Sequence, residues 1–491
     1  MSRASCAVLL VAAALAAAAG TRAPDPGFGG ALDVQLSLAA RDGTPLESPV
    51  AGEPFRVQVW LADPASGRPV EDEHPSAWIR PVATSNSRCS EAARAYFVNQ
   101  GALPRGSTDL ARSLYAVSHE DGTVSIIDWE HSIASANILA VAEVKDLAGP
   151  IAPLRPSFAF VALTKDGRRV HVDAAEGTSP RPMPTADRTT APSLVSANGW
   201  VAQGRWVFPP DDSASLDLGD TVIALSSALP DEELGVHDGV LALLDPGVAV
   251  LIPEDGRPEA PVEGPPGATW AAHAASADAT LFVDGGSELV IVYGGNREVR
   301  TPLPAMASRV SVSPDGALAL AWSRDSRAVS IIEIATATVV QAVEVNRPPV
   351  DQTIREVAFA RGAAFLLLDR LDFVMVLDLA LARRGVPAAL RPVRIGPPVE
   401  DLPEGAGPFL VETARGHAGG TVLALHPDLS TAFPVMRDSG NTTAPMNGFR
   451  IRGARPQALA ELNGALRERA PGLYEGATVL ARGGPHELVV S

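Results

Sequence analysis

Four short apolar runs within residues 308–345 constrain the fold more than any other stretch of the sequence. Three turn signals separate these runs. Pro314-Asp315-Gly316 is the strongest, because proline fixes one turn dihedral and glycine accommodates the next. The stretch therefore predicts a four-stranded antiparallel meander. One such sheet leaves two apolar faces and two open edges, and arranging copies around an axis covers the faces. We interpret the stretch as one blade of a β-propeller.

Similar units recur along the middle of the chain. They span residues 114–128, 157–173, 194–252, 270–302, 354–393 and 408–435. Corresponding strand ends fall about 45 residues apart except across the long unit 194–252, and this spacing is typical of four-stranded blades. We predict a seven-bladed propeller within residues 108–440, or an eight-bladed one if residues 211–235 hold a further sheet. A large two-sheet sandwich is the alternative architecture.

The two ends of the chain differ from this middle part. Residues 31–85 alternate apolar and polar positions, which predicts the first part of an immunoglobulin-like β-sandwich with too few strands to close it. Residues 86–107 would be a linker in which Ser90 caps a short helix. In the closing part, 447–491, we expect a helix over 456–470 and then a β-hairpin. The fold class is therefore all-β, with one small sandwich split by the inserted propeller.

The N-terminus has the layout of a secretory signal peptide. Residues 1–19 combine a basic start, an apolar stretch and an Ala-x-Ala-like end. A membrane anchor is the alternative interpretation. No later apolar run approaches the ~20 residues of a membrane span, so we expect no span after cleavage and a periplasmic or secreted protein. The formal net charge of −17 argues against a nucleic-acid partner.

The middle of the chain resembles the exported seven-bladed propellers of the lactonase-like and quinoprotein-like group, which includes the haem domain of the nitrite-reductase type. The resemblance rests on Val-Ser-Val-Ser-Pro-Asp-Gly at 310–316, Val-Ser-Ile-Ile-Glu-Ile at 329–334 and Asp-Gly-Thr-Val-Ser-Ile-Ile-Asp at 121–128. Other blades depart from it, with Ala-Arg-Gly-Ala at 360–363 in place of Ser-Pro-Asp-Gly. The ends contain Gly-Glu-Pro-Phe-Arg-Val at 52–57, Gly-Leu-Tyr-Glu-Gly-Ala-Thr-Val at 472–479 and Gly-Gly-Pro-His-Glu-Leu-Val-Val at 483–490. On these residues they resemble the halves of a small bacterial periplasmic immunoglobulin-like module. That resemblance implies a role accessory to a metal or respiratory redox system.

One set of residues predicts a metal site. His74 and Cys89 flank the start of the propeller and Met446 follows its end, so a split sandwich would bring them toward one junction. Imidazole, thiolate and thioether together suit copper, and a thiol of low pKa could also hold a haem or a partner. The alternative is a loop histidine, an inert buried cysteine and a methionine that fills a gap in the core.

Aspartates recur at the ends of predicted strands. They are Asp128, Asp173, Asp245 and Asp378. Their carboxylates could bind a cation at a channel mouth. We favour the interpretation that they close turns by accepting backbone N–H groups. His119, His171 and His426 lie within or beside such strands, and two of them could ligate haem iron if they faced the axis.

These patterns together predict an exported, non-catalytic binding or assembly protein without a resident cofactor. A rigid propeller face with variable loops would bind a protein or a small-molecule ligand. The alternative is a redox or ligand-cleaving enzyme with a haem, copper or quinone site in the propeller channel or at the domain junction.

Overall fold

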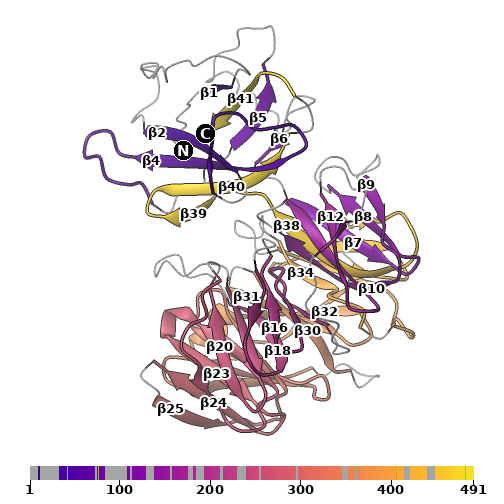
Figure 1. Ribbon diagram of the computed structural model, residues 1–491. Helices are drawn as coiled ribbons and strands as arrows, with labels where there is room; N and C mark the ends of the chain where they lie inside the picture. The colour runs from indigo at the N-terminus through magenta and orange to yellow at the C-terminus, as the bar shows by residue number, and fades with distance from the viewer. Residues whose placement is uncertain are drawn as a thin grey trace. The chain divides into compact units, whose positions relative to one another are not determined.

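The computed structural model describes residues 9–11, 32–40, 43–71, 75, 77–82, 108–110, 113–128, 138–154, 158–174, 181–183, 193–210, 214–228, 239–253, 256–294, 297–345, 352–360, 362–403, 405–413, 421–438, 448–480 and 483–490. These residues are almost entirely β-structured, and the fold class is all-β as predicted (Figure 1). Helical segments among them are short: the 3₁₀ turn η3 (Ala275–Ala277) and the helix α2 (Leu379–Arg383). The chain divides into two compact units, residues 1–113, 155–159 and 463–491, and residues 114–154 and 160–462.

The larger unit is a β-propeller. Its described residues form eight four-stranded antiparallel sheets, and in seven of them the strands follow one another in sequence. These seven sheets are, in chain order, β10 (Leu147–Leu154), β11 (Ala159–Thr164), β12 (Arg169–Asp173) and β13 (Arg181–Pro182); β14 (Ser193–Val195), β15 (Val201–Gln203), β16 (Trp206–Phe208) and β17 (Leu216–Asp217); β18 (Val222–Ala228), β19 (Gly239–Leu244), β20 (Val248–Ile252) and β21 (Val262–Glu263); β22 (Trp270–Ala274), β23 (Ala279–Val283), β24 (Glu288–Tyr293) and β25 (Arg297–Pro302); β26 (Arg309–Val312), β27 (Leu318–Trp322), β28 (Ala328–Glu333) and β29 (Thr338–Glu344); β30 (Ile354–Ala360), β31 (Ala363–Leu368), β32 (Phe373–Asp378) and β33 (Arg391–Arg394); and β34 (Leu410–Glu412), β35 (Thr421–His426), β36 (Thr431–Met436) and β37 (Phe449–Arg450).

The eighth sheet closes the ring with strands from both ends of the propeller sequence. β38 (Pro456–Asn463) pairs beside β7 (Ser113–His119), which is followed by β8 (Thr123–Ile127) and β9 (Ile138–Glu143). Figure 1 shows the yellow β38 next to the purple β7 and β8. A late segment therefore supplies the first strand of a sheet whose other strands come early in the chain, which removes an open edge.

Apolar side chains between successive sheets hold the ring together. One core cluster joins Leu281 and Ile291 of one sheet to Val310 and Ala319 of the next, and similar clusters link the following sheets. Second and third strands are buried along most of their length. The first strands of neighbouring sheets contact each other, as β18 does β22 and β22 does β26, so the first strand is the innermost one.

The number of sheets exceeds the predicted seven because the long unit 194–252 contains two, β14–β17 and β18–β21. Strands of two or three residues, such as β15 and β16, give a weak alternation signal. The boundary between the two sheets falls inside residues 211–235, the region for which we left an eighth sheet open.

The predicted helix over 456–470 is wrong. These residues form β38 and β39 (Arg467–Ala470) instead. Ala, Leu, Glu and Gln give the segment a high helix propensity, but β7 offers an unpaired edge and buried packing positions, and such tertiary context overrides local propensity. The propeller unit runs to Leu462, so β37 and β38, which follow residue 440, complete two of its sheets.

The smaller unit is built from both ends of the chain. One sheet has the order β3-β2-β4-β40-β39 and the other β1-β41-β5-β6. Their remaining strands are β1 (Leu9–Val11), β2 (Asp33–Ala40), β3 (Pro45–Leu46), β4 (Pro54–Ala62), β5 (Ala77–Pro81), β6 (Thr108–Asp109), β40 (Leu473–Val479) and β41 (His486–Val490). β4 pairs with β40, and β5 pairs with β41.

A shared core packs the two sheets of this unit together. It includes Phe55 and Val57 of one sheet, Ile79 and Leu488 of the other, and the buried Tyr474. The two ends of the chain thus form one β unit, while its immunoglobulin-like character stays a prediction. β1 lies inside the predicted signal peptide. In the described part of the chain, helices are all too short to cross a membrane.

Candidate functional site on the innermost strands

The predicted metal ligands His74, Cys89 and Met446 all lie outside the described residues. Within the described part of the chain, no group of three or more His, Cys, Asp or Glu side chains is placed to hold a metal ion. The copper hypothesis therefore stays a prediction, and the described side chains of the propeller offer a separate candidate site.

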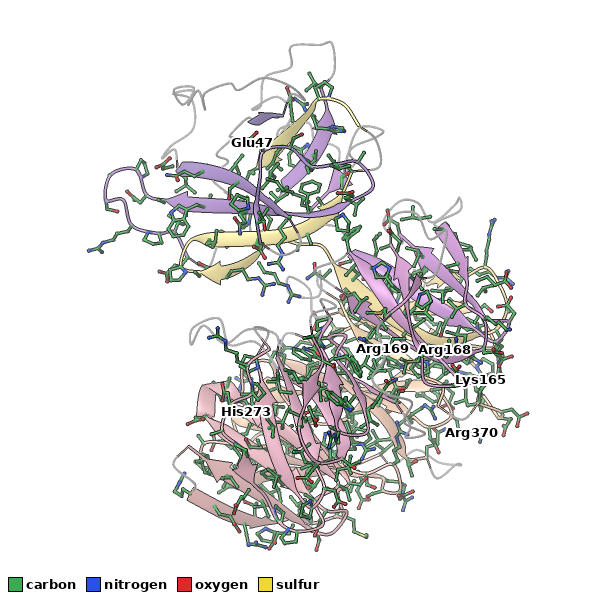
Figure 2. All side chains as sticks on the ribbon, in the orientation of Figure 1. Glu47, Lys165, Arg168, Arg169, His273 and Arg370 are labelled. Atoms are coloured by element: carbon green, nitrogen blue, oxygen red, sulfur yellow. The ribbon has the colours of Figure 1, made fainter. Side chains whose placement is uncertain are left out.

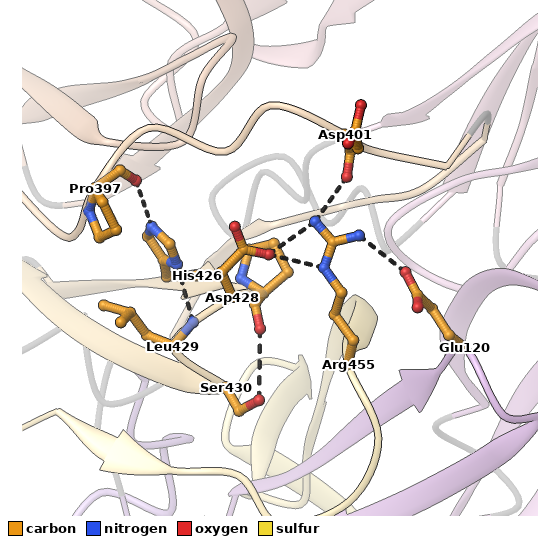
Figure 3. Close-up of polar contacts among 9 residues, drawn as sticks. Glu120, Pro397, Asp401, His426, Asp428, Leu429, Ser430 and Arg455 are labelled. Atoms are coloured by element: carbon orange, nitrogen blue, oxygen red, sulfur yellow. Dashed lines mark hydrogen bonds and ion pairs between the residues drawn. The ribbon is translucent and has the colours of Figure 1, made fainter.

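Two of the histidines considered as haem ligands tie neighbouring sheets together. His119 Nδ1 donates to Ala454 O at 2.8 Å, and its Nε2 accepts from Ser125 Oγ at 2.9 Å. His426 occupies the equivalent position at the end of β35. Its Nε2 donates to Pro397 O at 2.8 Å, and its Nδ1 accepts from Leu429 N at 3.3 Å (Figure 3).

Both imidazoles are therefore neutral hydrogen-bonding groups inside the protein. Burial lowers the pKa of His119 and of His426, which favours the uncharged ring. Glycines lie against both rings: a Cβ built on Gly396 would lie 2.2 Å from the His426 ring, and one built on Gly453 would lie 3.0 Å from the His119 ring. The third histidine, His171, is buried on β12, a third strand.

The strand-end aspartates lie away from the innermost strands. Asp378 ends the third strand β32, where its carboxylate accepts from Leu381 N at 3.0 Å to cap α2 and pairs with Arg437 at 2.9 Å. Asp173 ends the third strand β12, Asp128 follows the third strand β8, and Asp245 follows the second strand β19. For Asp378, the favoured turn-closing interpretation describes the observed contacts.

The innermost strands carry a different set of charged and polar side chains, which we call the inner-strand set. Its members are His273 on β22, Arg309 on β26, Arg355 and Glu356 on β30, Glu412 on β34 and Glu461 on β38. All six are partly or fully accessible, although apolar neighbours on the same strands are buried. Figure 2 labels His273 within the propeller unit. The innermost strands thus differ from the second and third strands of the same sheets, which are almost wholly apolar.

Two glutamates of this set connect β30 and β34 reciprocally. Glu356 Oε2 accepts from the backbone N–H groups of Phe409 and Leu410, both at 2.8 Å. Glu412 Oε1 accepts from Phe359 N at 2.8 Å. Each carboxylate thus binds backbone donors at the neighbouring sheet, which satisfies groups that no strand ladder pairs.

The protonation of these glutamates is shifted. Burial raises the pKa of Glu356. The pKa of Glu412 is raised to about 7, chiefly by desolvation, while the hydrogen bond from Phe359 opposes the shift and the charge of Glu461 adds to it. The Glu412 side chain remains open to water, which screens such effects, so the physical consequence is proton uptake at a higher pH than is usual for a carboxyl group. Glu461 itself accepts a hydrogen bond from Tyr115 Oη at 3.1 Å.

Two arginines of the set stack on aromatic rings. The guanidinium carbon of Arg309 lies 4.3 Å from the centroid of the Trp270 ring, and that of Arg355 lies 5.2 Å from the centroid of Phe409. Such stacking fixes the plane of a guanidinium group and leaves its edge free for hydrogen bonds. The inner side of the propeller therefore has a basic group on β26, both a basic and an acidic group on β30, and acidic groups on β34 and β38.

This set was not predicted from the sequence. The only signal for it was charge inside otherwise apolar runs, such as Arg355-Glu356 between Ile354 and Val357. That signal becomes specific only when the first strand of each sheet is known, because charged side chains are common on an outer fourth strand that faces solvent.

Comparisons with known proteins give structural similarities alone. No protein-family model matches the chain, and no curated protein matches it significantly. Among solved structures, AztD from Citrobacter koseri matches at 12% identity and a TM-score of 0.44, covering 72% of this chain and 98% of that one. Dihydro-heme d1 dehydrogenase NirN in complex with DHE matches at 13% identity and a TM-score of 0.47, covering 82% and 83%. BamB from Moraxella catarrhalis matches at 13% identity and a TM-score of 0.42, covering 66% and 89%.

All three are distant matches and assign neither a family nor a function. The description of the larger unit as a β-propeller depends on its own sheet order and ring closure. The finer resemblance to the lactonase-like and quinoprotein-like group stays a prediction.

Proposed function

We propose that the chain is an exported, non-catalytic binding or assembly protein that uses its propeller to hold a protein or small-molecule ligand. The inner-strand set is the observation that carries this proposal. Its charged side chains are accessible and are fixed by hydrogen bonds and aromatic stacking. A rigid ring with fixed charges is suited to recognition, since little side-chain entropy is lost on binding.

The histidine contacts favour this function over haem chemistry in the propeller. A haem ligand needs a free imidazole nitrogen. Both ring nitrogens of His119 and of His426 already have partners within the protein. Freeing one would break a contact within the protein and leave a buried polar group unpaired.

Export and an accessory role in a metal or respiratory redox system belong to the same proposal. The layout of residues 1–19 supports export. The resemblance of the chain ends to a periplasmic module supports the accessory role. The proposed ligand contacts involve only the propeller.

Absorbance spectroscopy of the purified full-length protein, from the near ultraviolet to the red, tests the absence of redox chemistry. We expect a colourless protein whose spectrum shows aromatic absorbance alone. Elemental analysis of the same sample, with Cys89→Ala as the matched variant, should find no stoichiometric copper or iron. A haem or copper–thiolate band, or stoichiometric metal lost in the variant, would instead establish the redox alternative.

A further inference from the structure

We propose that Arg309, Arg324 and Arg355 form an oxyanion-binding site on the propeller, which takes the phosphate or carboxylate groups of a small polyanionic ligand. This inference rests on the proposed binding function and specifies the chemistry of its ligand.

The fold brings the three arginines to the same edge of two neighbouring sheets. Arg309 is the first residue of β26 and pairs in register with Trp322, the last residue of β27. Arg324 follows two residues later, in the turn between β27 and β28. Arg355 is the second residue of β30, the first strand of the next sheet. Since first strands of a propeller run in the same direction, Arg309 and Arg355 both lie where these strands begin.

The Arg309 side chain is held in a fixed orientation. Trp270 Nε1 donates to Val310 O at 3.1 Å, which fixes the indole, and the Arg309 guanidinium stacks on that ring. Arg309 Nη1 donates to Ser308 O at 2.8 Å. Among the described residues, Nε and Nη2 of Arg309 have no acceptor, so one edge of the guanidinium is available to a ligand.

Arg355 is anchored in a similar way. Its Nη2 donates to Ala406 O at 2.8 Å, and its guanidinium lies over Phe409. Its Nε is buried and lacks a hydrogen-bond acceptor in the described part of the chain. The Glu356 carboxylate approaches it only to 3.7 Å, and the other oxygen of Glu356 accepts two backbone N–H groups. A buried donor without a partner is costly unless a ligand or water satisfies it.

Positive charge exceeds negative charge at this edge. Arg324 is exposed, and within the described residues neither Arg324 nor Arg309 has a carboxylate partner. Burial lowers the pKa of Arg309 and of Arg355, and the Arg324 charge lowers both further, while the charges of Glu356 and Asp369 oppose the shift of Arg355. The facing carboxyl groups are those of Glu356 and Asp369, and burial raises the pKa of both. Three guanidinium groups thus gather in a chain whose formal net charge is −17.

This arrangement favours an oxyanion over other ligands. A guanidinium edge presents parallel N–H donors that match the two oxygens of a carboxylate or phosphate group. A bound anion would remove the mutual repulsion of the three cations and satisfy the Arg355 Nε. A ligand with two or more oxyanion groups would engage all three side chains.

Isothermal titration calorimetry of the full-length protein tests the proposal, with pyrophosphate and citrate as separate probes at low ionic strength. We expect saturable binding of at least one probe. Pyrophosphate binding alone would identify a phosphate ligand, and citrate binding alone a polycarboxylate. Arg324→Gln should weaken the binding about ten- to hundredfold, since hydrogen bonds between charged groups contribute about 1.5–3 kcal/mol. Arg309→Lys keeps the positive charge but removes the parallel N–H donors of the guanidinium group, so it should also weaken the binding.

Arg205→Gln is the matched control, because Arg205 is an exposed arginine that pairs with Asp217 on another sheet. Its affinity for the probe should equal that of the unchanged protein. Arg324 is exposed in a turn, so its replacement should leave the melting temperature unchanged. Absence of saturable binding of both probes, or equal binding by the Arg324→Gln protein, would overturn the oxyanion site. Either result would leave the colourless, metal-free protein of the broader proposal untouched.

Discussion

Arg455 should stabilise the strand that closes the propeller, and its replacement by alanine should lower the stability of the propeller. Arg455 directly precedes β38. Its guanidinium pairs with Glu120 at 3.0 Å, with Asp428 at 2.8 Å, and donates to Asp401 O at 2.6 Å (Figure 3). These partners lie in the β7–β8 turn, the β35–β36 turn and the connection from β33 to β34. One side chain therefore joins segments of three sheets at the point of closure.

The expected loss can be worked from these contacts. Both ion pairs are partly exposed, so each should contribute about 0.2–1 kcal/mol. The hydrogen bond to the Asp401 carbonyl should add about 1 kcal/mol. Arg455→Ala should thus lower the free energy of unfolding of the propeller by about 1–3 kcal/mol. Equilibrium urea unfolding followed by far-ultraviolet circular dichroism measures this change.

Arg300→Ala is the matched control. Arg300 also binds two carboxylates, Glu288 and Glu298, but all three lie on β24 and β25 of one sheet. Its two pairs are exposed, so its loss should shift the urea midpoint less than the loss of Arg455, which also breaks the hydrogen bond to Asp401 O. Added salt should narrow the difference between Arg455→Ala and the unchanged protein, because it screens the exposed pairs. Equal shifts for the two variants would refute the role of Arg455 in ring closure.

Further predictions concern single contacts. Glu412 has a pKa of about 7 in the folded protein against about 4.5 in the unfolded chain, so the native state binds a proton more tightly and stability should fall as pH rises through this interval. The melting temperature of Glu412→Gln should therefore depend less on pH than that of the unchanged protein. Parallel melting profiles for the two proteins would contradict the shift. Gly396→Ala should lower the free energy of unfolding by about 1–3 kcal/mol in urea, because the new Cβ would clash with the His426 ring. The loss caused by Gly396→Ala should be smaller when His426 is also replaced by alanine. Strictly additive losses would exclude the clash. Asp378→Ala should lower stability by about 1–2 kcal/mol through the lost helix cap, and Asp378→Asn, which keeps an acceptor, should lose less if capping is the cause.

The architecture of the propeller was predictable wherever strands were long and turns carried clear residues. Residues 308–345 contain Pro314-Asp315-Gly316 between a strand of alternating burial and a fully buried strand, and they fold as the expected four strands. The short strands β15 and β16 left no such pattern, so two sheets were predicted as one. The periodic pattern therefore located the repeating four-stranded unit, but it missed one sheet whose strands are at most three residues long.

Ring closure could not be predicted because it is a non-local pairing. Pro456 is followed by alanines, leucines and glutamates, which favour a helix. Nothing in the segment itself indicates that β7 has an unpaired edge. The pairing of β38 with β7 joins residues more than three hundred positions apart in the chain. Contacts of this separation depend on the completed topology and leave no local trace.

The inner-strand set depends on the same topological fact. Each propeller sheet has four strands, and the inner-strand set lies on the one that is innermost in the ring. Arg300 on the fourth strand β25 and Arg309 on the first strand β26 are both arginines next to apolar residues. Arg300 pairs with exposed carboxylates, whereas Arg309 stacks on Trp270 and lacks a carboxylate partner among the described residues. With β38 as the first strand of the closing sheet, every sheet of the propeller has its first strand innermost. Arg309 and Arg355 then lie on the first strands of neighbouring sheets, at the same edge. The inner-strand set is thus defined by position in the ring, and no short sequence motif marks it.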